Sequence, residues 1–320
     1  MSEQTAVSLK GIQAARARLA PTIVRTPLVC LNGPETPCKI YLKLENLQPV
    51  GSFKMRGAGN AILGIEPDRL SRGVWTASAG NMAQGVAWYA RHLGLPCSVV
   101  VPDDAPQTKI DAIQGLGARI FKVPFFDYQT IQRNHACSFM EGTLIHPFGD
   151  KAVMAGNGTI GLEILEDLPD VDAIIIPFGG GGLSCGIASA LRGLRPQVKL
   201  YAAEVATGAP FAASLAEGKP VETAFTASFV SGIGGPRVFP EMWSLASQLL
   251  DDSLVVSLSQ VAEAIRILCR GSHVVAEGAG AVALAAALSG RVPAAKVVCI
   301  VSGGNIDMSK LVRILQEKDP

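Results

Sequence analysis

The sequence predicts an α/β protein of two domains, each with an open, mostly parallel, twisted sheet covered by helices. From Val74 onward, short apolar strands alternate with helical segments, a pattern that is typical of parallel sheets covered on both faces. The 34 glycines and the low aromatic content of 6% suit tight turns between strands and helices. Apolar residues make up 48% of the 320 residues and charged residues only 17%, so the chain can bury a large core.

The first part of the chain supplies a helix and a strand region. Apolar residues recur on one face of an expected helix over 8–19, which Pro21 ends. Leu28 begins the strand region, and Ile40–Glu45 alternates apolar and charged residues, as a strand does.

Strands and helices then alternate to the C-terminus. Up to residue 148 we expect strand Val74–Ser78, helix Asn81–Leu93, strand Cys97–Val101, helix Ala105–Leu116, strand Arg119–Val123, helix Tyr128–Met140 and strand Thr143–Ile145. After it we expect helix 151–167, strand Ala173–Pro177, helix 183–194, strand Lys199–Glu204, helices 257–270 and 279–289, strand Lys296–Val301 and helix 307–317. The first series predicts a small domain, 74–148, beside a large domain of residues 1–73 and 149–320.

Charge, hydropathy and cysteine usage exclude several classes of protein. The net charge is +1 and no basic block is present, which argues against nucleic acid or an anionic membrane as a partner. No apolar run approaches the roughly 20 residues of a membrane span, and Met1–Gln4 has no signal-peptide pattern. The seven cysteines are scattered and lie mostly in apolar segments, so they indicate reduced thiols in a cytoplasmic protein.

The stretch Gly51-Ser52-Phe53-Lys54-Met55-Arg56-Gly57 places a lysine where a loop enters a helix. Apolar surroundings lower the pKa of a lysine and make its amine available, as a Schiff-base lysine requires. The alternative is an ordinary surface lysine whose stem lies along the protein surface.

Four glycines, Gly179–Gly182, follow the expected strand Ala173–Pro177 and precede a helix. Their free backbone N–H groups and the positive helix end predict a phosphate site. A nicotinamide-binding turn is the alternative, with Glu204 as the ribose-binding acid, but the Gly-x-Gly-x-x-Gly spacing fails because registers from Gly179 and Gly180 end on Ser184 and Cys185.

Two more turns follow expected strands, at the edge where open α/β sheets bind ligands. Ser78–Gln84 offers backbone amides that suit a carboxylate, although it is also an ordinary helix start. Ser302–Asn305 presents a neutral hydroxyl to the same region, or is a simple strand exit.

In this order and over nearly the whole chain, these features resemble the fold type II pyridoxal-phosphate enzymes, closest to the serine/threonine dehydratase and serine racemase group. The matching motifs are Ser52-Phe53-Lys54-Met55-Arg56-Gly57, Ser78-Ala79-Gly80-Asn81, His146-Pro147-Phe148, Ala155-Gly156-Asn157-Gly158-Thr159, Gly179–Gly182-Leu183, Glu277-Gly278-Ala279-Gly280 and Ser302-Gly303-Gly304-Asn305. The resemblance implies a tryptophan-synthase-β-like fold, a large cofactor-binding domain, a small substrate-side domain and a homodimer.

The resemblance also implies roles for single residues. Lys54 is the catalytic residue, which binds pyridoxal 5'-phosphate covalently and, once freed by the substrate, takes the Cα proton. The other implied cofactor residues are Phe53, Asn81 at the ring hydroxyl, Gly179, Gly180, Gly181, Gly182 and Leu183 at the phosphate, Gly232, Glu277, and Ser302 at the ring nitrogen. The implied residues for the substrate carboxylate are Ser78, Ala79, Gly80, Asn81 and Met82.

The implied reaction is dehydration and deamination of L-threonine or L-serine, a small amino-acid substrate, to a 2-oxo acid and ammonia. A serine at the ring nitrogen makes a weaker electron sink than a carboxylate, which favours β-elimination over transamination. Racemases of this group carry a serine where this chain has Ala79, so racemisation is the alternative that this residue disfavours. An NAD(P)-dependent oxidoreductase is a remote alternative.

Three departures from the group bear on substrate and cations. Met82 replaces a histidine, and Phe125-Phe126 adds apolar bulk, so either a larger substrate such as phenylserine or 3-hydroxyaspartate binds, or these side chains are core. Glu204 matches a divalent-metal ligand of some relatives, but residues 205–216 contain no second carboxylate, so no metal is assigned. A monovalent cation held by carbonyl groups stays open.

Overall fold

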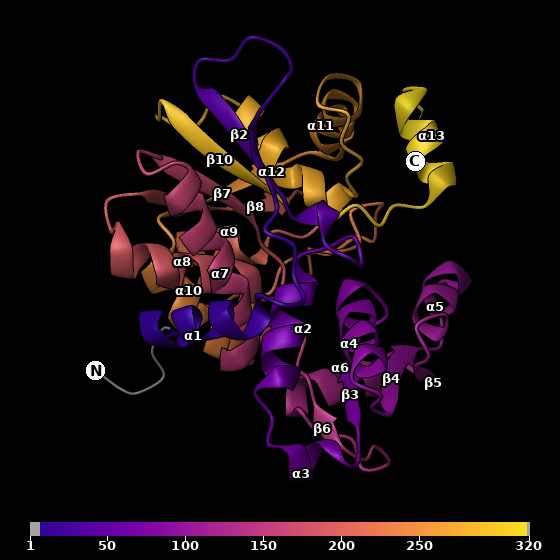
Figure 1. The fold of residues 1–320 in the computed structure, drawn as a ribbon. Helices are drawn as coiled ribbons and strands as arrows, with labels where there is room; N and C mark the ends of the chain where they lie inside the picture. Colours follow the sequence, from indigo (N-terminus) through magenta and orange to yellow (C-terminus); the bar gives the residue numbers. More distant parts are fainter. Residues whose placement is uncertain (1–6, 319–320) are drawn as a thin grey trace.

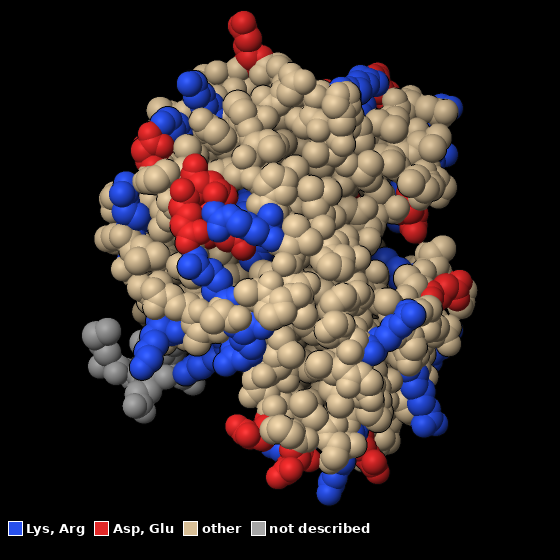
Figure 2. Space-filling view, viewed as in Figure 1, with Lys and Arg blue, Asp and Glu red and all other residues tan. Residues whose placement is uncertain are grey.

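The computed structural model describes residues 7–318 and confirms the α/β class, with two mostly parallel sheets covered by helices (Figure 1). Met1–Gln4, where no signal pattern is expected, lies outside the described residues. Within residues 7–318, no helix is both long enough and apolar enough to cross a membrane. Charged side chains of both signs are scattered among large uncharged areas on the face shown in Figure 2.

The larger sheet has six strands in the order β1-β2-β10-β7-β8-β9, of which only β1 pairs antiparallel with its neighbour. The strands are β1 (Leu28–Cys30), β2 (Lys39–Leu44), β7 (Ala173–Pro177), β8 (Lys199–Val205), β9 (Asp252–Val256) and β10 (Lys296–Val301). Successive residues of a strand point to opposite faces. Ile174 and Ile176 therefore enter one core, and Ala173 and Ile175 enter the other.

Helices cover both faces of this sheet. One core includes side chains of α1 (Leu9–Leu19), α7 (Lys151–Asp167), α8 (Gly182–Leu194), α9 (Pro210–Glu217) and α10 (Pro240–Leu249). The opposite core includes side chains of α11 (Leu258–Gly271), α12 (Gly278–Leu288) and α13 (Met308–Leu315).

The smaller sheet has four parallel strands in the order β5-β4-β3-β6. They are β3 (Val74–Ala77), β4 (Cys97–Pro102), β5 (Arg119–Val123) and β6 (Thr143–Leu144). One face packs against α4 (Asn81–His92), α5 (Gln107–Gln114) and α2 (Lys54–Leu63), and the other against α6 (Phe125–Asn134). The short helices η1 (Glu45–Leu47) and α3 (Pro67–Leu70) lie in connections.

Helix α2 packs against both parts of the molecule, since it contacts α7 beside the larger sheet and α4 beside the smaller one. Both contacts depend on glycine. A Cβ on Gly156 would lie 2.2 Å from the Arg56 carbonyl oxygen, and a Cβ on Gly59 would lie 2.2 Å from the Tyr89 ring.

Two expectations about elements differ from the structure. The helix expected over Tyr128–Met140 is α6, which starts after Pro124 and ends where His135 takes a left-handed φ of 53°. The sequence reasoning did not identify α9, α10 or β9. Both helices have proline in their first turn, which is a helix-start signal, and α10 also has buried apolar residues at helical spacing, Met242, Leu245, Ala246 and Leu249.

Candidate active site

The loop that carries Lys54 is hydrogen-bonded to the serine turn, which we define as Ser302–Asn305. Phe53 N donates to Ser302 O (3.0 Å) and Gly304 N donates to Gly51 O (2.9 Å). Gly51 has a φ of +71°, and a Cβ there would lie 2.7 Å from the Asn305 side chain. The structure therefore fixes the start of α2 against the end of β10.

The Lys54 side chain is partly buried and faces the protein. Its Nζ donates to Pro147 O (2.7 Å) and lies 5.0 Å from the centroid of the Phe53 ring. Burial lowers the pKa of Lys54 to about 8, although the charge of Glu277 opposes this shift. A substantial fraction of the amine is thus neutral near physiological pH, which a nucleophilic or basic lysine requires.

The glycine turn, Gly179–Gly182, lies against the residue that follows the Lys54 acceptor. A Cβ on Gly180 would lie 2.3 Å from the Phe148 ring, and a Cβ on Gly182 would lie 2.8 Å from the Phe148 carbonyl oxygen. The turn and the lysine amine therefore meet at Pro147 and Phe148, although they are more than a hundred positions apart in the sequence.

The glycine turn fits a phosphate group. Gly181 has a φ of +85°, which a side chain would disfavour, and α8 begins at Gly182 without a side-chain cap. Uncapped N–H groups at the positive end of a helix are a site for an anion. Leu183, the next residue, has its side chain in the core and can contribute through its backbone.

Asn81 and Glu277 form a hydrogen-bonded pair from opposite parts of the molecule. Asn81 Nδ2 donates to Glu277 Oε1 (2.6 Å), and Asn81 Oδ1 accepts from Asn305 Nδ2 (2.8 Å). Burial raises the pKa of Glu277 to about 7, while the hydrogen bond from Asn81 opposes the shift. Glu277 can therefore hold or release a proton near neutral pH.

Ser302 and Gly232 lie beside this pair. Ser302 is buried, and its Oγ donates to Ala279 O (3.4 Å). A Cβ on Gly232 would lie 2.8 Å from the Ala279 side chain and 3.8 Å from Glu277 Oε1. A Cβ on Gly179 would lie 3.3 Å from Ile233, the residue after Gly232, so the glycine turn also lies close to the Gly232 segment.

The asparagine turn, Ser78–Met82, leaves β3 and starts α4. Ser78 Oγ accepts from Gly80 N (3.2 Å), and Ala79 packs at the edge of the core. The side chain of Met82 is only 1% exposed and belongs to that core, while Phe126 is 75% exposed. Met82 therefore fits the core alternative, while Phe125, which is 52% exposed, and Phe126 fit neither the core nor an enclosed apolar pocket.

The Glu204 carboxylate is hydrogen-bonded to donors of the protein itself. It accepts from Phe211 N (2.9 Å), Ala212 N (2.7 Å) and Ser253 Oγ (2.6 Å). Burial raises the pKa of Glu204. Within the described part of the chain, no group of three His, Cys, Asp or Glu residues could hold an ion. Glu204 instead satisfies the N–H groups of the first turn of α9.

Sequence reasoning missed a buried ion-pair network around Arg56, two residues after Lys54. Arg56 donates to Glu45 (2.8 Å) and Glu163 (2.7 Å), and Lys43 Nζ donates to Glu163 (2.6 Å). Burial is the largest single influence and would raise the pKa of Glu45. The charge and hydrogen bonds of Arg56, the hydrogen bond from Thr26 and the charge of Lys43 together outweigh burial, so the Glu45 pKa is lowered. The available signal was Arg56, a second charged residue beside Lys54 in a helix that is otherwise uncharged, because buried charges need partners.

His146 is a structural residue beside the site. Its Nδ1 accepts from Gly149 N (2.9 Å), so its Nε2 carries the proton and donates to Gln132 O (3.2 Å). Burial, helped by His135, lowers the pKa of His146 to about 4. The neutral ring thus fixes the 146–149 segment that accepts the Lys54 hydrogen bond.

Comparisons with known proteins agree with this geometry. Residues 19–303 match the family described as pyridoxal-phosphate dependent enzyme. An L-threonine ammonia-lyase of Thermotoga maritima is 39% identical over 97% of this chain and 79% of its own length. A catabolic L-threonine dehydratase of Staphylococcus aureus is 36% identical over 97% of this chain and 92% of its own length.

Solved structures show the same architecture. A serine racemase of maize superposes with a TM-score of 0.86 at 31% identity, over 98% of both chains. The chain therefore belongs to the pyridoxal-phosphate dependent enzymes of fold type II.

Proposed function

We propose that this enzyme removes water and then ammonia from a β-hydroxy amino acid, L-threonine or L-serine, to give a 2-oxo acid. The proposal rests mainly on one observation. Contacts in the fold bring together Lys54, the glycine turn, Asn81 and Ser302, although they are far apart in the sequence. The names of two relatives, a threonine ammonia-lyase and a threonine dehydratase, support it.

Three side chains and one turn would hold pyridoxal phosphate. They are Lys54 at its aldehyde, Asn81 at its ring hydroxyl, Ser302 at its ring nitrogen and the glycine turn at its phosphate. When bound, the cofactor supplies an electron sink for the bond broken at Cα. The uncapped N–H groups of α8 would stabilise its anionic phosphate. Residues 1–73 and 149–320 would bind the cofactor, and residues 74–148 would bind the substrate.

Lys54 would perform the proton transfer. Its Nζ, with a pKa lowered by burial to about 8, can accept the Cα proton while Pro147 O orients the amine. The backbone N–H groups of the asparagine turn would bind the substrate carboxylate at the start of α4. Loss of the Cβ hydroxyl with this proton gives water. The resulting enamine becomes an imine, takes up water and releases ammonia.

Racemisation is the second candidate, because a serine racemase shares the fold at 31% identity. A racemase needs an acid on each side of Cα. Ala79 has no polar group to donate from the side opposite Lys54, which favours elimination.

The test is release of ammonia and 2-oxo acid from L-threonine and L-serine by the cofactor-loaded enzyme. We expect both products from the wild-type enzyme, and a loss of at least about 10³-fold in kcat for Lys54→Ala. Lys151→Ala, which changes a lysine of α7 outside the candidate site, is the control. Formation of D-serine faster than pyruvate would instead establish racemisation.

A further inference from the structure

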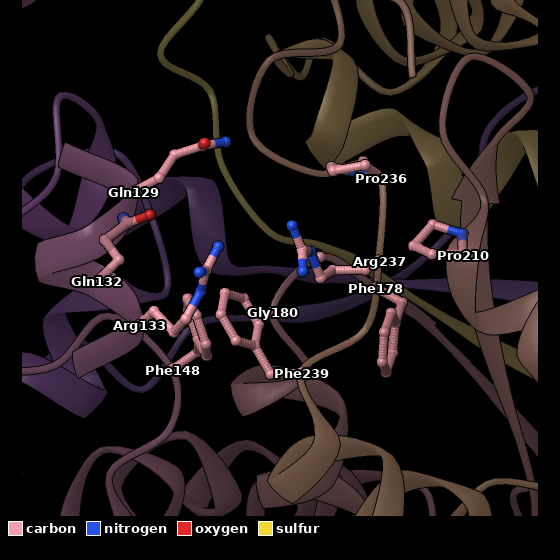
Figure 3. A pocket seen from close by; sticks show the side chains of 13 residues that line it. Gln129, Gln132, Arg133, Phe148, Phe178, Gly180, Pro210, Pro236, Arg237 and Phe239 are labelled. Atoms are coloured by element: carbon pink, nitrogen blue, oxygen red, sulfur yellow. The ribbon is translucent and has the colours of Figure 1, made fainter. Parts of the chain in front are cut away.

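A cavity of about 220 Å³ lies between α6 and the loop 234–239 (Figure 3). Gly179 and Gly180 of the glycine turn form part of its wall, as does Phe148. Gln129, Gln132 and Arg133 enter it from α6, and Arg237 enters it from the facing loop. The cavity thus opens beside the candidate active site but has its own set of polar side chains.

Hydrogen bonds connect α6 both to the end of β3, just before the asparagine turn, and to the segment 146–147 beside Lys54. Gln132 Nε2 donates to Ala77 O (3.0 Å), and Ala77 directly precedes the asparagine turn. The carbonyl oxygen of Gln132 accepts from His146, and the adjacent Pro147 O accepts from Lys54. These bonds fix the position of α6 at Gln132 relative to the asparagine turn and to the 146–147 segment, and Arg133 is the next residue of the same helix.

The charge of the cavity has one sign. Arg133 and Arg237 are its only ionisable lining residues, and Figure 3 shows both guanidinium groups directed into the space between α6 and the loop. Arg237 pairs with Glu222 (3.2 Å), but the Glu222 side chain is 71% exposed, so water competes for that contact. Within residues 7–318, Arg133 has no ion pair. Two guanidinium groups, with the Gln129 side-chain amide beside them in the lining, suit a planar anion.

We propose that Arg133 and Arg237 bind the second carboxylate of a dicarboxylic β-hydroxy amino acid of the 3-hydroxyaspartate type. The inference rests on the proposed function and names the substrate class of that same site. The α-carboxylate would lie at the asparagine turn and the distal carboxylate in the cavity. A cavity of about 220 Å³ accommodates a few heavy atoms, not a segment of another macromolecule.

The chemistry needs no additional reactant. The Cα hydrogen and the Cβ hydroxyl leave as water, and the product enamine takes a proton at Cβ to become an imine. Water then adds and ammonia leaves, so the product is a 2-oxo dicarboxylic acid. A neutral phenyl substituent would leave both arginines without a partner, which disfavours phenylserine.

The test compares substrates across matched arginine variants of the cofactor-loaded enzyme. The variants are Arg133→Gln, Arg237→Gln and, as control, Arg69→Gln on the exposed helix α3. We expect each cavity variant to lose roughly 10- to 100-fold in kcat/KM for 3-hydroxyaspartate, mainly through KM, because each removes a charged hydrogen bond. Activity on L-serine and the absorbance of the loaded cofactor should stay near the wild-type values.

A binding measurement separates this inference from the proposed reaction. Succinate has two carboxylates and no amine, and calorimetry should show that it binds more tightly than butyrate, with the difference lost in both cavity variants. If no amino acid releases ammonia but succinate binding behaves in this way, the proposed reaction fails and the anion site stands. A second outcome is that L-serine is converted, but both cavity variants bind succinate and convert 3-hydroxyaspartate as well as the wild-type enzyme does. The proposed reaction then stands, and the arginine site is wrong. Equal losses for all substrates with weaker cofactor binding would show that the arginines hold the phosphate, and would overturn the inference.

Discussion

The amine of Lys54 illustrates how burial prepares a single residue for chemistry. Removal of water from an ammonium group favours its neutral form, and burial lowers the pKa of Lys54 to about 8. Glu277 opposes this shift, since a negative charge nearby favours the protonated amine. The two groups are therefore coupled, and the pKa of Glu277 is itself raised by burial to about 7.

We expect the rate at which the cofactor-free enzyme takes up pyridoxal phosphate to rise with pH and to level off above about 8. Only the neutral amine attacks an aldehyde, and well below the pKa its fraction grows about tenfold per pH unit. Stopped-flow absorbance at a series of pH values measures this rate. Glu277→Gln should move the midpoint to lower pH, because it removes the charge that raises the Lys54 pKa. A midpoint near that of an exposed lysine would contradict a buried amine.

Helix α2 is the element that presents Lys54, and its position depends on two kinds of contact. The buried network places Arg56 between Glu45 and Glu163, so the helix is tied to η1 and to α7. Close backbone contact then requires glycine at Gly156, where a Cβ would lie 2.2 Å from Arg56 O. Charges of opposite sign satisfy each other in the network, and removal of one would leave another buried and unpaired.

Gly156→Ala should destabilise the protein by about 1–3 kcal/mol, because a methyl group must push α7 away from the backbone of α2. Gly193→Ala in α8 is the matched control. A Cβ there would lie 3.6 Å from Leu9, which is an ordinary contact, so we expect a gain of about 0.5–1 kcal/mol from the better helix former. Unfolding in urea measures both changes. Equal stability of Gly156→Ala and the wild type would show that α2 and α7 are not in close contact.

Local patterns made several elements and site residues predictable. Strand β7 and the glycine turn were predictable, because a short apolar run followed by four glycines has few interpretations other than a buried strand and a tight turn. The partners of these residues were not, since Pro147 O reaches Lys54 from 93 residues away and Glu277 reaches Asn81 from 196 residues away. Helix α10 carries an apolar repeat at Met242, Leu245, Ala246 and Leu249 that the sequence reasoning overlooked. Helix α9 is short, and its start is stabilised by a contact distant in the fold, the Glu204 carboxylate.

At the scale of the whole molecule, the candidate site is a joint between the two sheets. Asn81 from the smaller part bonds both Glu277 and Asn305 of the larger part. Farther out, Lys109 Nζ of α5 donates to Ser231 Oγ (3.1 Å). Burial raises the pKa of Glu277, and the charge of Lys109 partly opposes that rise across the joint. A ligand bound here would touch turns that belong to both sheets, so its binding energy should stabilise both.

Removal of the cofactor should therefore lower the melting temperature of the whole protein by roughly 10 °C, for a free cofactor concentration near a thousand times the dissociation constant. Calorimetry of the loaded and cofactor-free enzyme measures this change, and Lys54→Ala with the same free cofactor retains the noncovalent part of it. Hydrogen exchange locates the effect. Because Asn81 and the serine turn would bind one molecule from opposite sides, we expect exchange to slow at both 78–82 and 302–305. Protection confined to one of these turns would mean that the other does not contact the cofactor, and the joint would then bind its ligand from one side only.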